Sequence, residues 1–346
     1  MSHRITGISG LKRYVDLSDD EADEIERASR EFRWAITPYY ASLMDRKDRN
    51  CPIRKQAIPS ARELEDVLGE EDPLHEEKHS PTRGLIHLYP DRVAFCVTNR
   101  CAMFCRHCVR KRIVGKRDYN LSQGDLAKGI RYIREHEEVR DVLITGGDPL
   151  VAQDAWIESL LREIRAIDHV EIIRIGTRTL CTMPQRITNE LCDILSRYHP
   201  IWINTQFNHP KEITEEAAAA CDRLLRAGVP LGNQSVLLRG INDDTDTMKK
   251  LVHSLVKIRV RPYYLYQCEV VRGTAHFRTP VERGLEIIQS LQGFTTGFAV
   301  PRFVVDTPIG KVPVAPQNIV ARDENSVTLR NYEGKVWQLP NSVNWR

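Results

Sequence analysis

Three cysteines in one short stretch constrain this chain more than any other feature of its sequence. Cys101, Cys105 and Cys108 follow the apolar run Val93–Thr98 at spacings of four and three residues. Three thiols on one loop can face one centre, and thiolates select soft metals. Zinc sites and four-iron clusters each take four ligands, so three cysteines leave one coordination position open. An open position indicates a reactive site.

Two plainer interpretations compete with a reactive cluster. The cysteines could be small buried apolar residues, or the loop could hold a structural zinc completed by His107. The first gives no reason for the spacing or for the flanking basic residues Arg106, Arg110, Lys111 and Arg112. The C-x3-C-x2-C pattern resembles the radical S-adenosylmethionine (SAM) superfamily, in which three cysteines hold a 4Fe-4S cluster whose fourth iron binds SAM.

Composition indicates a globular protein with few clues to its partners. Fifty basic and 47 acidic residues give a net charge of +3, and no basic block indicates a nucleic-acid or membrane surface. No stretch approaches the roughly 18 apolar residues of a membrane span, and the N-terminus lacks the apolar core of a signal peptide. Nine cysteines, most of them isolated, indicate reduced thiols. We therefore expect a cytoplasmic protein.

Strand and helix signals alternate from Arg92 onward. Amphipathic segments such as Trp156–Ile164 and Thr214–Ala227 separate short β-branched runs. This alternation predicts a parallel sheet with helices outside, and six units are too few for a closed eight-stranded barrel. We expect an α/β fold, an open partial (βα)6 barrel with its chemistry at the carboxyl ends of the strands. The six expected strands are Val93–Thr98, Val142–Thr145, Glu171–Ile175, Ile201–Thr205, Pro230–Leu238 and Val260–Tyr266.

Residues 1–80 precede the expected barrel and carry no strand signal. A capping serine, Ser18, followed by acidic residues predicts a helix start, and prolines then break the region into short helices and turns. The acidic stretch Glu71–His79 is typical of a solvated connector. We expect a helical N-terminal region, with residues 81–280 forming the barrel.

Residues 281–346 form a small C-terminal α+β segment in this interpretation. Thr279-Pro-Val-Glu282 matches a capping box with proline at the first helical position and predicts a helix to about Leu291. Arg302–Val305 is a further strand candidate, and a hairpin is expected across Asn331–Gly334. We expect this segment to lie at the lid or edge of the barrel.

Further segments resemble one branch of the radical SAM enzymes, the lysine 2,3-aminomutase family, which also uses pyridoxal 5′-phosphate (PLP). The resemblance runs from about residue 31 to residue 333. It rests on the cysteine loop and on Ala35–Tyr40, Arg54–Pro59, Leu88–Arg92, Gly146–Asp148, Ile173–Arg178, Phe207–Glu212, Gly232–Leu238, Arg261–Tyr264 and Val304–Asp306. It implies an isomerase that moves the α-amino group of an amino acid to the β-carbon, with a 4Fe-4S cluster, SAM and PLP as cofactors.

The resemblance implies that Cys101, Cys105 and Cys108 hold the cluster. Glycine lacks a Cβ, which lets backbone approach the methionine amino group of SAM. A Gly-Gly-Asp sequence alone is an ordinary turn, but here it follows a strand and a three-cysteine loop. The positions expected near SAM are His107, Gly146, Gly147, Asp148, Arg178, Asn233 and Gln234.

PLP enzymes bind their cofactor through a lysine amine and hold its phosphate with cationic groups. The family's lysine follows an Asp-Pro-Gly segment, which here is Asp306-Thr-Pro-Ile-Gly-Lys311, so Lys311 is the expected catalytic lysine. The loop is shorter than in the family and has one glycine where the family has several. Tyr89 and Arg92 match the family's phosphate-binding positions.

The substrate side of the resemblance involves three charged residues. Arg110 falls on the position that holds the substrate carboxylate, a task that suits the planar fork of a guanidinium. Glu269 and Asp306 fall on the two positions that bind the distal end of the substrate. Two carboxylates facing one pocket favour a cation between them, which implies a basic L-amino acid, with lysine as first choice. Arginine is the rival, because its guanidinium has five donors for two carboxylates.

Two departures from the family concern polar positions. Asp244 stands where relatives carry a zinc-binding cysteine, so we expect no zinc, and Gln206, beside Asn204, replaces a histidine. Two alternatives remain open: oxidation of a basic amino acid without amino migration, and a non-catalytic metal-binding or interaction protein. We expect as partners an amino acid, an electron donor such as flavodoxin or ferredoxin, and further copies of the chain in a homo-oligomer.

Overall fold

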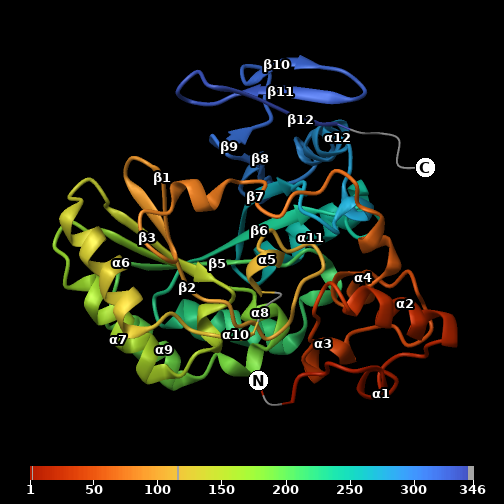
Figure 1. Cartoon of the computed structure of the whole chain (residues 1–346), viewed down its shortest axis with the longest axis horizontal. Helices are drawn as coiled ribbons and strands as arrows, with labels where there is room; N and C mark the ends of the chain where they lie inside the picture. The colour runs from red at the N-terminus through yellow and green to blue at the C-terminus, as the bar shows by residue number, and fades with distance from the viewer. Residues whose placement is uncertain (2, 115–116, 342–346) are drawn as a thin grey trace.

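An open barrel of parallel strands forms the centre of the molecule in the computed structural model, which describes residues 1, 3–114 and 117–341 (Figure 1). Within these residues, seven consecutive strands pair in parallel, and the sheet order follows the chain from β1 to β9. The parallel strands are β2 (Arg92–Thr98), β3 (Asp141–Gly146), β4 (Ile172–Gly176), β5 (Ile201–Thr205), β6 (Leu231–Leu237), β7 (Arg261–Gln267) and β8 (Arg302–Thr307). The six expected strands are confirmed, and the further strand candidate Arg302–Val305 is confirmed as β8, which joins them as a seventh parallel strand.

Antiparallel strands flank the parallel ones at both ends of the sheet. β1 (Leu85–Tyr89) pairs with β2, and β9 (Gly310–Pro313) pairs with β8. Neither was expected, because both are short and carry weak alternation. β9 places Lys311 opposite Asp306 in this register.

Amphipathic helices pack outside the barrel and alternate with its strands. In α7 the residues Ile157, Leu160, Leu161 and Ile164 are buried on one face, as their spacing predicted. Side chains of Ser122, Thr188 and Thr214 cap the helices that they precede. The main helices are α6 (Gln123–Glu135), α7 (Asp154–Arg165), α9 (Asn189–Ser196), α10 (Glu215–Arg226), α11 (Thr245–Lys257) and α12 (Val281–Leu291).

The start of α12 differs from the expected capping box. Pro280 occupies the N-cap position, and the buried hydroxyl of Thr279 makes no hydrogen bond within the described residues. Asn341, 60 residues further on, accepts a hydrogen bond from the backbone N–H of Val281 at 2.9 Å. The prediction of a local cap was wrong because a tertiary partner satisfies the first turn.

The N-terminal region consists of short helices packed against one side of the barrel (Figure 1). The predicted capping serine of α2 is confirmed, and the structure adds a capping box, since the Ser18 hydroxyl and the Glu21 carboxylate each accept a backbone N–H. The expected solvated connector is wrong at Glu76, which is buried. The helical segments are α1 (Ile8–Leu11), α2 (Asp19–Ser29), α3 (Pro38–Ser42), α4 (Pro52–Ala57), η1 (Ala61–Glu65) and η2 (Glu76–His79).

Short helical turns follow several strands and carry site residues. They are α5 (Lys111–Val114), η3 (Pro149–Val151), α8 (Thr179–Thr182), η4 (Pro184–Arg186), η5 (Pro210–Glu212), η6 (Ala275–Phe277) and η7 (Gly297–Ala299). Most lie at the ends of strands where side chains face the barrel interior.

A three-stranded antiparallel sheet lies beyond β9, at the top of the view in Figure 1. It contains β10 (Ile319–Arg322), β11 (Ser326–Arg330) and β12 (Val336–Pro340). The expected hairpin across Asn331–Gly334 is confirmed as the β11–β12 pair. β10, an exposed edge strand, was not expected.

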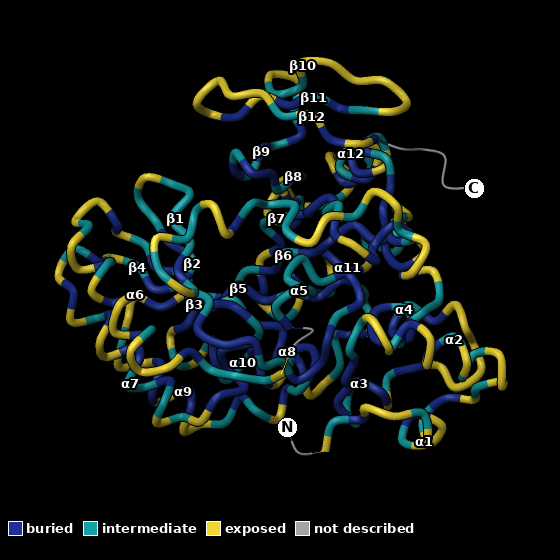
Figure 2. Tube along the Cα trace, in the orientation of Figure 1, coloured by how far each residue is buried: buried dark blue, intermediate teal, exposed yellow. Residues whose placement is uncertain are grey.

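The three expected parts of the chain contribute to one apolar core. Tyr40, Ile144 and Leu329 all belong to the largest buried cluster, although they come from the N-terminal, barrel and C-terminal parts. The barrel strands are deeply buried, whereas the outer edges of the C-terminal sheet are exposed (Figure 2).

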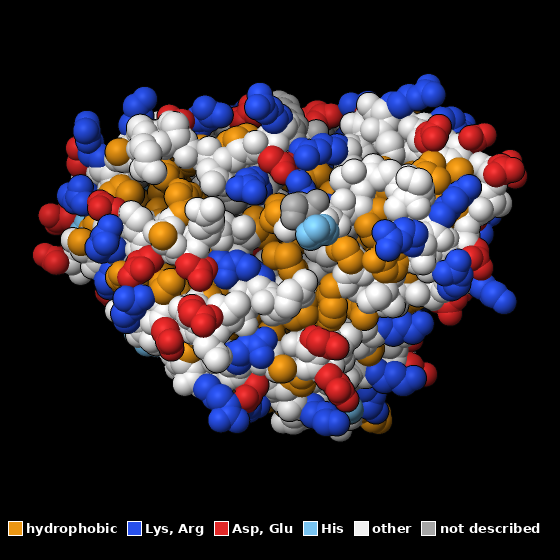
Figure 3. Space-filling view, turned by 90° about the horizontal axis from the view of Figure 1, so that it is seen from below, with side chains coloured by type: hydrophobic (Ala, Val, Ile, Leu, Met, Phe, Trp, Pro, Cys, Tyr) orange, Lys and Arg blue, Asp and Glu red, His pale blue; other side chains and the backbone are white. Residues whose placement is uncertain are grey.

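The surface carries both charge signs. On the face shown in Figure 3, basic and acidic side chains are interspersed around a central band of hydrophobic ones. Among the described residues, no helix has the length and apolar character needed to cross a membrane.

Candidate active site

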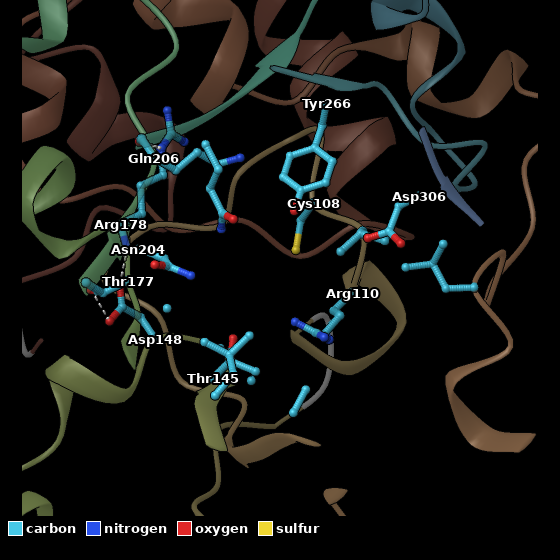
Figure 4. A pocket seen from close by; sticks show the side chains of 18 of the residues that line it. Cys108, Arg110, Thr145, Asp148, Thr177, Arg178, Asn204, Gln206, Tyr266 and Asp306 are labelled. Carbon is cyan, nitrogen blue, oxygen red and sulfur yellow. Dashed lines mark hydrogen bonds between the residues drawn. The ribbon is translucent and has the colours of Figure 1, made fainter. Parts of the chain in front are cut away.

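A cavity of about 370 Å³ opens at the carboxyl ends of the strands and contains most of the residues singled out from the sequence. Pockets for small ligands have volumes of this order. Its lining includes Tyr89, Arg92, Cys101, Cys105, His107, Cys108, Arg110, Gly146, Gly147, Asp148, Arg178, Gln234, Glu269, Asp306 and Lys311. Figure 4 shows Cys108, Arg110, Asp306 and Tyr266 around this space. Asn204 and Gln206 also line it.

Asn233 is the one expected site residue that does not line this cavity. Its side chain is fully buried and faces the backbone of Phe207. Its carbonyl oxygen accepts the Phe207 N–H at 2.7 Å, and its amide donates to the Phe207 carbonyl at 3.1 Å. Asn233 therefore holds the turn after β5, next to Gln206.

The cysteine loop is docked onto the N-terminal region. Backbone N–H groups of Phe104 and Arg106 donate to the carbonyls of Ala35 and Gln56, each at 3.0 Å. These contacts fix the loop on the side away from the cavity, so the thiols of Cys101, Cys105 and Cys108 line the cavity.

Two cations from this loop share one buried carboxylate. Arg106 donates to Glu63 at 2.6 and 2.9 Å, and the Lys111 ammonium lies 2.7 Å from the same carboxylate. Burial acts to raise the pKa of Glu63, but Arg106 and Lys111 outweigh it and lower that pKa to about 2. Burial lowers the pKa of Lys111 to about 8. Glu63 thus anchors the loop in its charged form.

Gly146 and Gly147 allow the end of β3 to approach the start of the cysteine loop. Gly146 has φ of 129°, and a Cβ there would lie 2.2 Å from the Thr98 carbonyl oxygen. A Cβ on Gly147 would lie 2.4 Å from the carbonyl oxygen of Arg100. Both contacts are far inside van der Waals distance, so the glycines are required by the protein's own backbone.

Asp148 joins the ends of two neighbouring strands. Its carboxylate accepts hydrogen bonds from Thr177 Oγ1 at 2.6 Å and from the backbone N–H groups of Leu150 and Arg178 at 3.1 and 2.8 Å (Figure 4). Burial raises its pKa, and these hydrogen bonds oppose that rise. Asp148 thereby fixes the start of the Arg178 turn relative to β3.

Arg178 lies between a cysteine of the loop and a buried polar network. Its Nη1 donates to Cys105 Sγ at 2.8 Å, and its Nη2 donates to Glu212 and Gln56 at 2.8 and 2.6 Å. Burial acts to lower the pKa of Arg178, but Cys105, Tyr40 and Glu212 raise it above its ordinary value. A cation beside a thiolate sulfur stabilises the negative charge of a metal ligand.

His107 is a buried residue that lines the cavity. Its Nε2 lies 3.2 Å from Asn208 Nδ2, whereas its buried Nδ1 makes no hydrogen bond within the described part of the chain. Burial lowers the pKa of His107 well below the usual value, so the ring is neutral. A neutral imidazole with a free nitrogen fits a polar group of a bound nucleoside.

The donor set fits a cluster with one open position. Among the described residues, no three His, Cys, Asp or Glu side chains converge on a single metal ion. Three thiols line one wall of the cavity, and soft thiolate donors suit an iron–sulfur cluster. Asp244, for which no zinc was expected, caps α11 by accepting the Thr247 N–H at 2.8 Å.

Lys311 approaches the cavity from β9. Its ammonium lies 2.9 Å from Asp306 Oδ2, and its backbone N–H donates to the Tyr89 hydroxyl at 2.7 Å. The Arg92 guanidinium lies over the Tyr89 ring, 3.7 Å from its centroid. An amine, a guanidinium and a phenol on one wall are the groups that an aldehyde carrying a phosphate needs.

Glu269 lies close enough to Asp306 for the negative charge of Asp306 to affect its ionisation. Burial, and then the negative charge of Asp306, raise the pKa of Glu269 to about 8. Burial acts to lower the pKa of Lys311, but Asp306 and Tyr89 raise it above its usual value. This end of the cavity therefore favours an additional positive charge.

Arg110 is held by a residue that the sequence analysis missed. Its Nε and Nη2 donate to the Glu76 carboxylate at 3.0 and 2.7 Å, and Arg112 donates to the same carboxylate at 3.3 Å. Glu76 was missed because it lies in the acidic stretch Glu71–His79, which was interpreted as a solvated connector. Tyr40, Gln56 and Glu212 were also missed individually, although each lies in a segment that carried the family resemblance.

Comparisons with known proteins agree with this geometry. Residues 95–252 match the radical SAM superfamily, and residues 288–345 match a family described as lysine-2,3-aminomutase. An L-lysine 2,3-aminomutase from Fusobacterium nucleatum is 53% identical over 97% of this chain and 80% of its own length. One from Clostridium subterminale is 51% identical over 99% of this chain and 83% of its own length.

The chain belongs to the lysine 2,3-aminomutase family. It is a radical SAM aminomutase, an isomerase with a 4Fe-4S cluster, SAM and PLP as cofactors. A glutamate 2,3-aminomutase from Clostridioides difficile is 49% identical over 98% of this chain and 81% of its own length. Family membership alone therefore does not decide the amino acid. A solved radical SAM methyltransferase from Sphaerobacter thermophilus covers 64% of this chain and 68% of its own, at 20% identity and a TM-score of 0.48.

Proposed function

We propose that this aminomutase acts on L-lysine and moves its α-amino group to the β-carbon. The observation that carries the proposal is the pair of acids, Glu269 and Asp306, at one end of the cavity. Glu269 is held partly uncharged by burial and by Asp306, and its pKa is about 8. A side-chain ammonium between the two acids would remove their repulsion. The relatives named L-lysine 2,3-aminomutase support the same substrate.

The substrate carboxylate binds at Arg110 in this proposal. Glu76 occupies the Nε and Nη2 edge of the guanidinium, which fixes its plane. Nη1 makes no hydrogen bond to any described residue and is available to the substrate. Arg110 and the two acids hold the two ends of the amino acid and so fix its β-carbon relative to the thiol wall.

The cofactors bind at different parts of the cavity in this proposal. Cys101, Cys105 and Cys108 hold the cluster, and SAM lies beside them, near His107, Gly146, Gly147, Asp148, Arg178 and Gln234. Lys311 binds PLP, with Tyr89 and Arg92 at its phosphate. When bound, the cluster and SAM supply the radical that starts the reaction, and PLP carries the migrating amino group.

Partners are assigned by chemistry. Four-iron clusters take up electrons one at a time, which supports a ferredoxin or flavodoxin as reductant. All nine cysteines are free, which supports a reducing, cytoplasmic location. We place the enzyme in a homo-oligomer, the commonest state of soluble assemblies.

Product analysis tests the substrate. Reconstituted, reduced enzyme is incubated anaerobically with lysine, arginine, ornithine, glutamate or leucine, and products are identified by mass and NMR. A β-amino isomer is expected from lysine. Turnover of arginine in preference to lysine would make arginine the substrate, and the argument that Glu269 and Asp306 bind a cationic side chain would still hold. An isomer from glutamate or leucine alone would contradict that argument, and an oxidised, non-isomerised product would overturn the migration.

A further inference from the structure

We propose that the β11–β12 turn, residues Asn331 to Gly334, positions the lysine that binds PLP. The inference rests on the proposed role of Lys311 and extends it to a part of the chain outside the cavity. None of the residues of this turn lines the cavity. The turn nevertheless contacts two places next to the expected PLP residues: Ile309, in the β8–β9 turn just before Lys311, and Tyr89, at the end of β1.

Asn331 connects the turn to the loop that precedes Lys311. Its amide Nδ2 donates to the carbonyl of Ile309 at 2.8 Å. Its carbonyl oxygen accepts the backbone N–H groups of Glu333 and Lys335 at 3.0 and 2.9 Å. One buried side chain therefore organises its own turn with the oxygen and holds the lysine loop with the nitrogen.

The lysine loop is a short turn whose conformation depends on a glycine. Gly310 has φ of 102°, a conformation that side chains rarely adopt, and it directly precedes Lys311. Within the loop, Thr307 Oγ1 donates to the Gly310 carbonyl at 2.7 Å. The hydrogen bond from Asn331 to Ile309 fixes the loop from outside, two residues before the amine-bearing residue.

Tyr332 provides a second contact, at the phosphate end. Its ring stacks on Tyr89 with centroids 6.4 Å apart and planes inclined by 25°. Tyr89 accepts the Lys311 backbone N–H and lies under the Arg92 guanidinium. Two adjacent residues of one turn thus make two separate contacts. Asn331 holds Lys311 by way of Ile309, and Tyr332 holds Tyr89 by stacking.

A cofactor bound at two points is sensitive to the separation of those points. PLP is held covalently at its aldehyde carbon and electrostatically at its phosphate, so Lys311 and the Tyr89–Arg92 pair must stay in register. A small displacement of one anchor weakens binding and slows attachment without unfolding the protein. Asn331 and Tyr332 are therefore positioning residues that act through Lys311 and Tyr89.

Asn331→Asp isolates the contact with the lysine loop. The carboxylate retains the oxygen that accepts from Glu333 and Lys335, but it replaces the amide donor with an oxygen facing the Ile309 carbonyl. Asn318→Asp is the matched control, because Asn318, just before β10, donates through Nδ2 to the Arg330 carbonyl at 3.1 Å and makes no hydrogen bond to the β8–β9 turn among the described residues. Tyr332→Ala and Tyr332→Phe form a second pair at an exposed position.

The experiment measures PLP binding to apoprotein by absorbance, the rate of borohydride trapping at Lys311 by peptide mapping, and the melting temperature of each variant. Asn331→Asp should weaken PLP binding about tenfold or more and slow trapping, because a donor is lost against a buried acceptor. Asn318→Asp and Tyr332→Phe should match the wild type. Tyr332→Ala should weaken PLP binding with an unchanged melting temperature.

The outcomes separate this inference from the proposed function. A wild-type label on a lysine other than Lys311 would overturn the cofactor assignment. A label on Lys311, with Asn331→Asp and Tyr332→Ala binding PLP as the controls do, would overturn the role of the turn alone. If Asn331→Asp has a much lower melting temperature than Asn318→Asp, its weaker PLP binding could reflect lost stability. The test then rests on Tyr332→Ala, because Tyr332 is exposed. Unchanged PLP binding in Tyr332→Ala would overturn the inference.

Discussion

Glu269, Asp306 and Lys311 share one end of the cavity, but their charges are balanced differently. Asp306 is charge-paired with Lys311 at 2.9 Å, whereas the pKa of Glu269 is raised to about 8 by burial and by Asp306. Lys311 must release its proton to bind an aldehyde, and the acids then lack a cation. In the proposed function a basic substrate supplies one, which would couple substrate choice to cofactor binding at this point.

Binding of a cationic substrate should depend on the ionisation of Glu269. Below a pKa of about 8 the carboxyl is largely protonated, so the KM for lysine should fall about tenfold per pH unit as the pH rises, and level off above it. Glu269→Gln should flatten this profile. The profile is measured with reconstituted holoenzyme from pH 6 to pH 9, and an unchanged profile in Glu269→Gln would assign the titration elsewhere.

The Glu269 carboxyl also makes the free energy of unfolding depend on pH. Its folded-state pKa lies above the ordinary value of 4.5, so the folded protein binds the proton more tightly than the unfolded chain. The contribution of Glu269 to the free energy of unfolding should therefore decrease as the pH rises from about 4.5 to about 8.

Two secondary-structure elements meet closely where β2 leads into the cysteine loop and β3 ends. The Gly147 N–H donates to the Thr98 carbonyl and the Asp148 N–H donates to the Arg100 carbonyl, the latter at 2.7 Å. The glycine pair expected near SAM thus has a structural requirement of its own. It brings the turn after β3 against the first residues of the loop that carries the thiols.

Gly147→Ala should displace the cysteine loop, because its Cβ would meet the Arg100 carbonyl oxygen at 2.4 Å. We expect a loss of several kcal/mol in stability from overpacking, at the upper end of the usual 1–3 kcal/mol, and reduced iron content after reconstitution. Gly124→Ala is the control, since its nearest neighbour would be the Ser122 hydroxyl at 3.9 Å. Iron loading equal to that of the control would show that the loop tolerates the displacement.

Across the whole molecule, the N-terminal region acts as part of the barrel. Glu63 of η1 is buried between Arg106 and Lys111, and Asp66 binds Arg278 near η6. These contacts connect the region to two loops at the mouth of the barrel. Loss of the N-terminal region would leave Arg106 buried without its carboxylate.

Glu63→Gln should destabilise the whole chain by about 3–5 kcal/mol, because it leaves a buried cation pair without a counter-charge. Glu65→Gln, on the exposed side of the same short helix, is the matched control and should change stability by less than about 0.5 kcal/mol. Denaturant unfolding of both variants, followed by tyrosine fluorescence and circular dichroism, measures the difference. A separate early transition confined to one probe would show that the N-terminal region unfolds alone.

Local patterns predicted the elements whose signals are complete within a few residues. The spacing of Ile157, Leu160 and Ile164 located α7, and the capping serine Ser18 with the acidic residues after it located the start of α2. β1, β9 and β10 were missed because short strands are stabilised by their neighbours rather than by their own alternation. The cap of α12 was misassigned because its true partner, Asn341, is remote in sequence.

The sequence by itself determined the chemistry of this protein: a three-cysteine loop, a lysine after Asp306, and a family resemblance that the relatives confirm. These are statements about residue type and spacing. Only the tertiary structure decided which charges are already paired, as Arg110 is with Glu76, Arg106 with Glu63 and Lys311 with Asp306. It also placed the Asn331 turn against the lysine loop. The reason is physical, because burial and Coulomb energy depend on distance through space, which residue order does not encode.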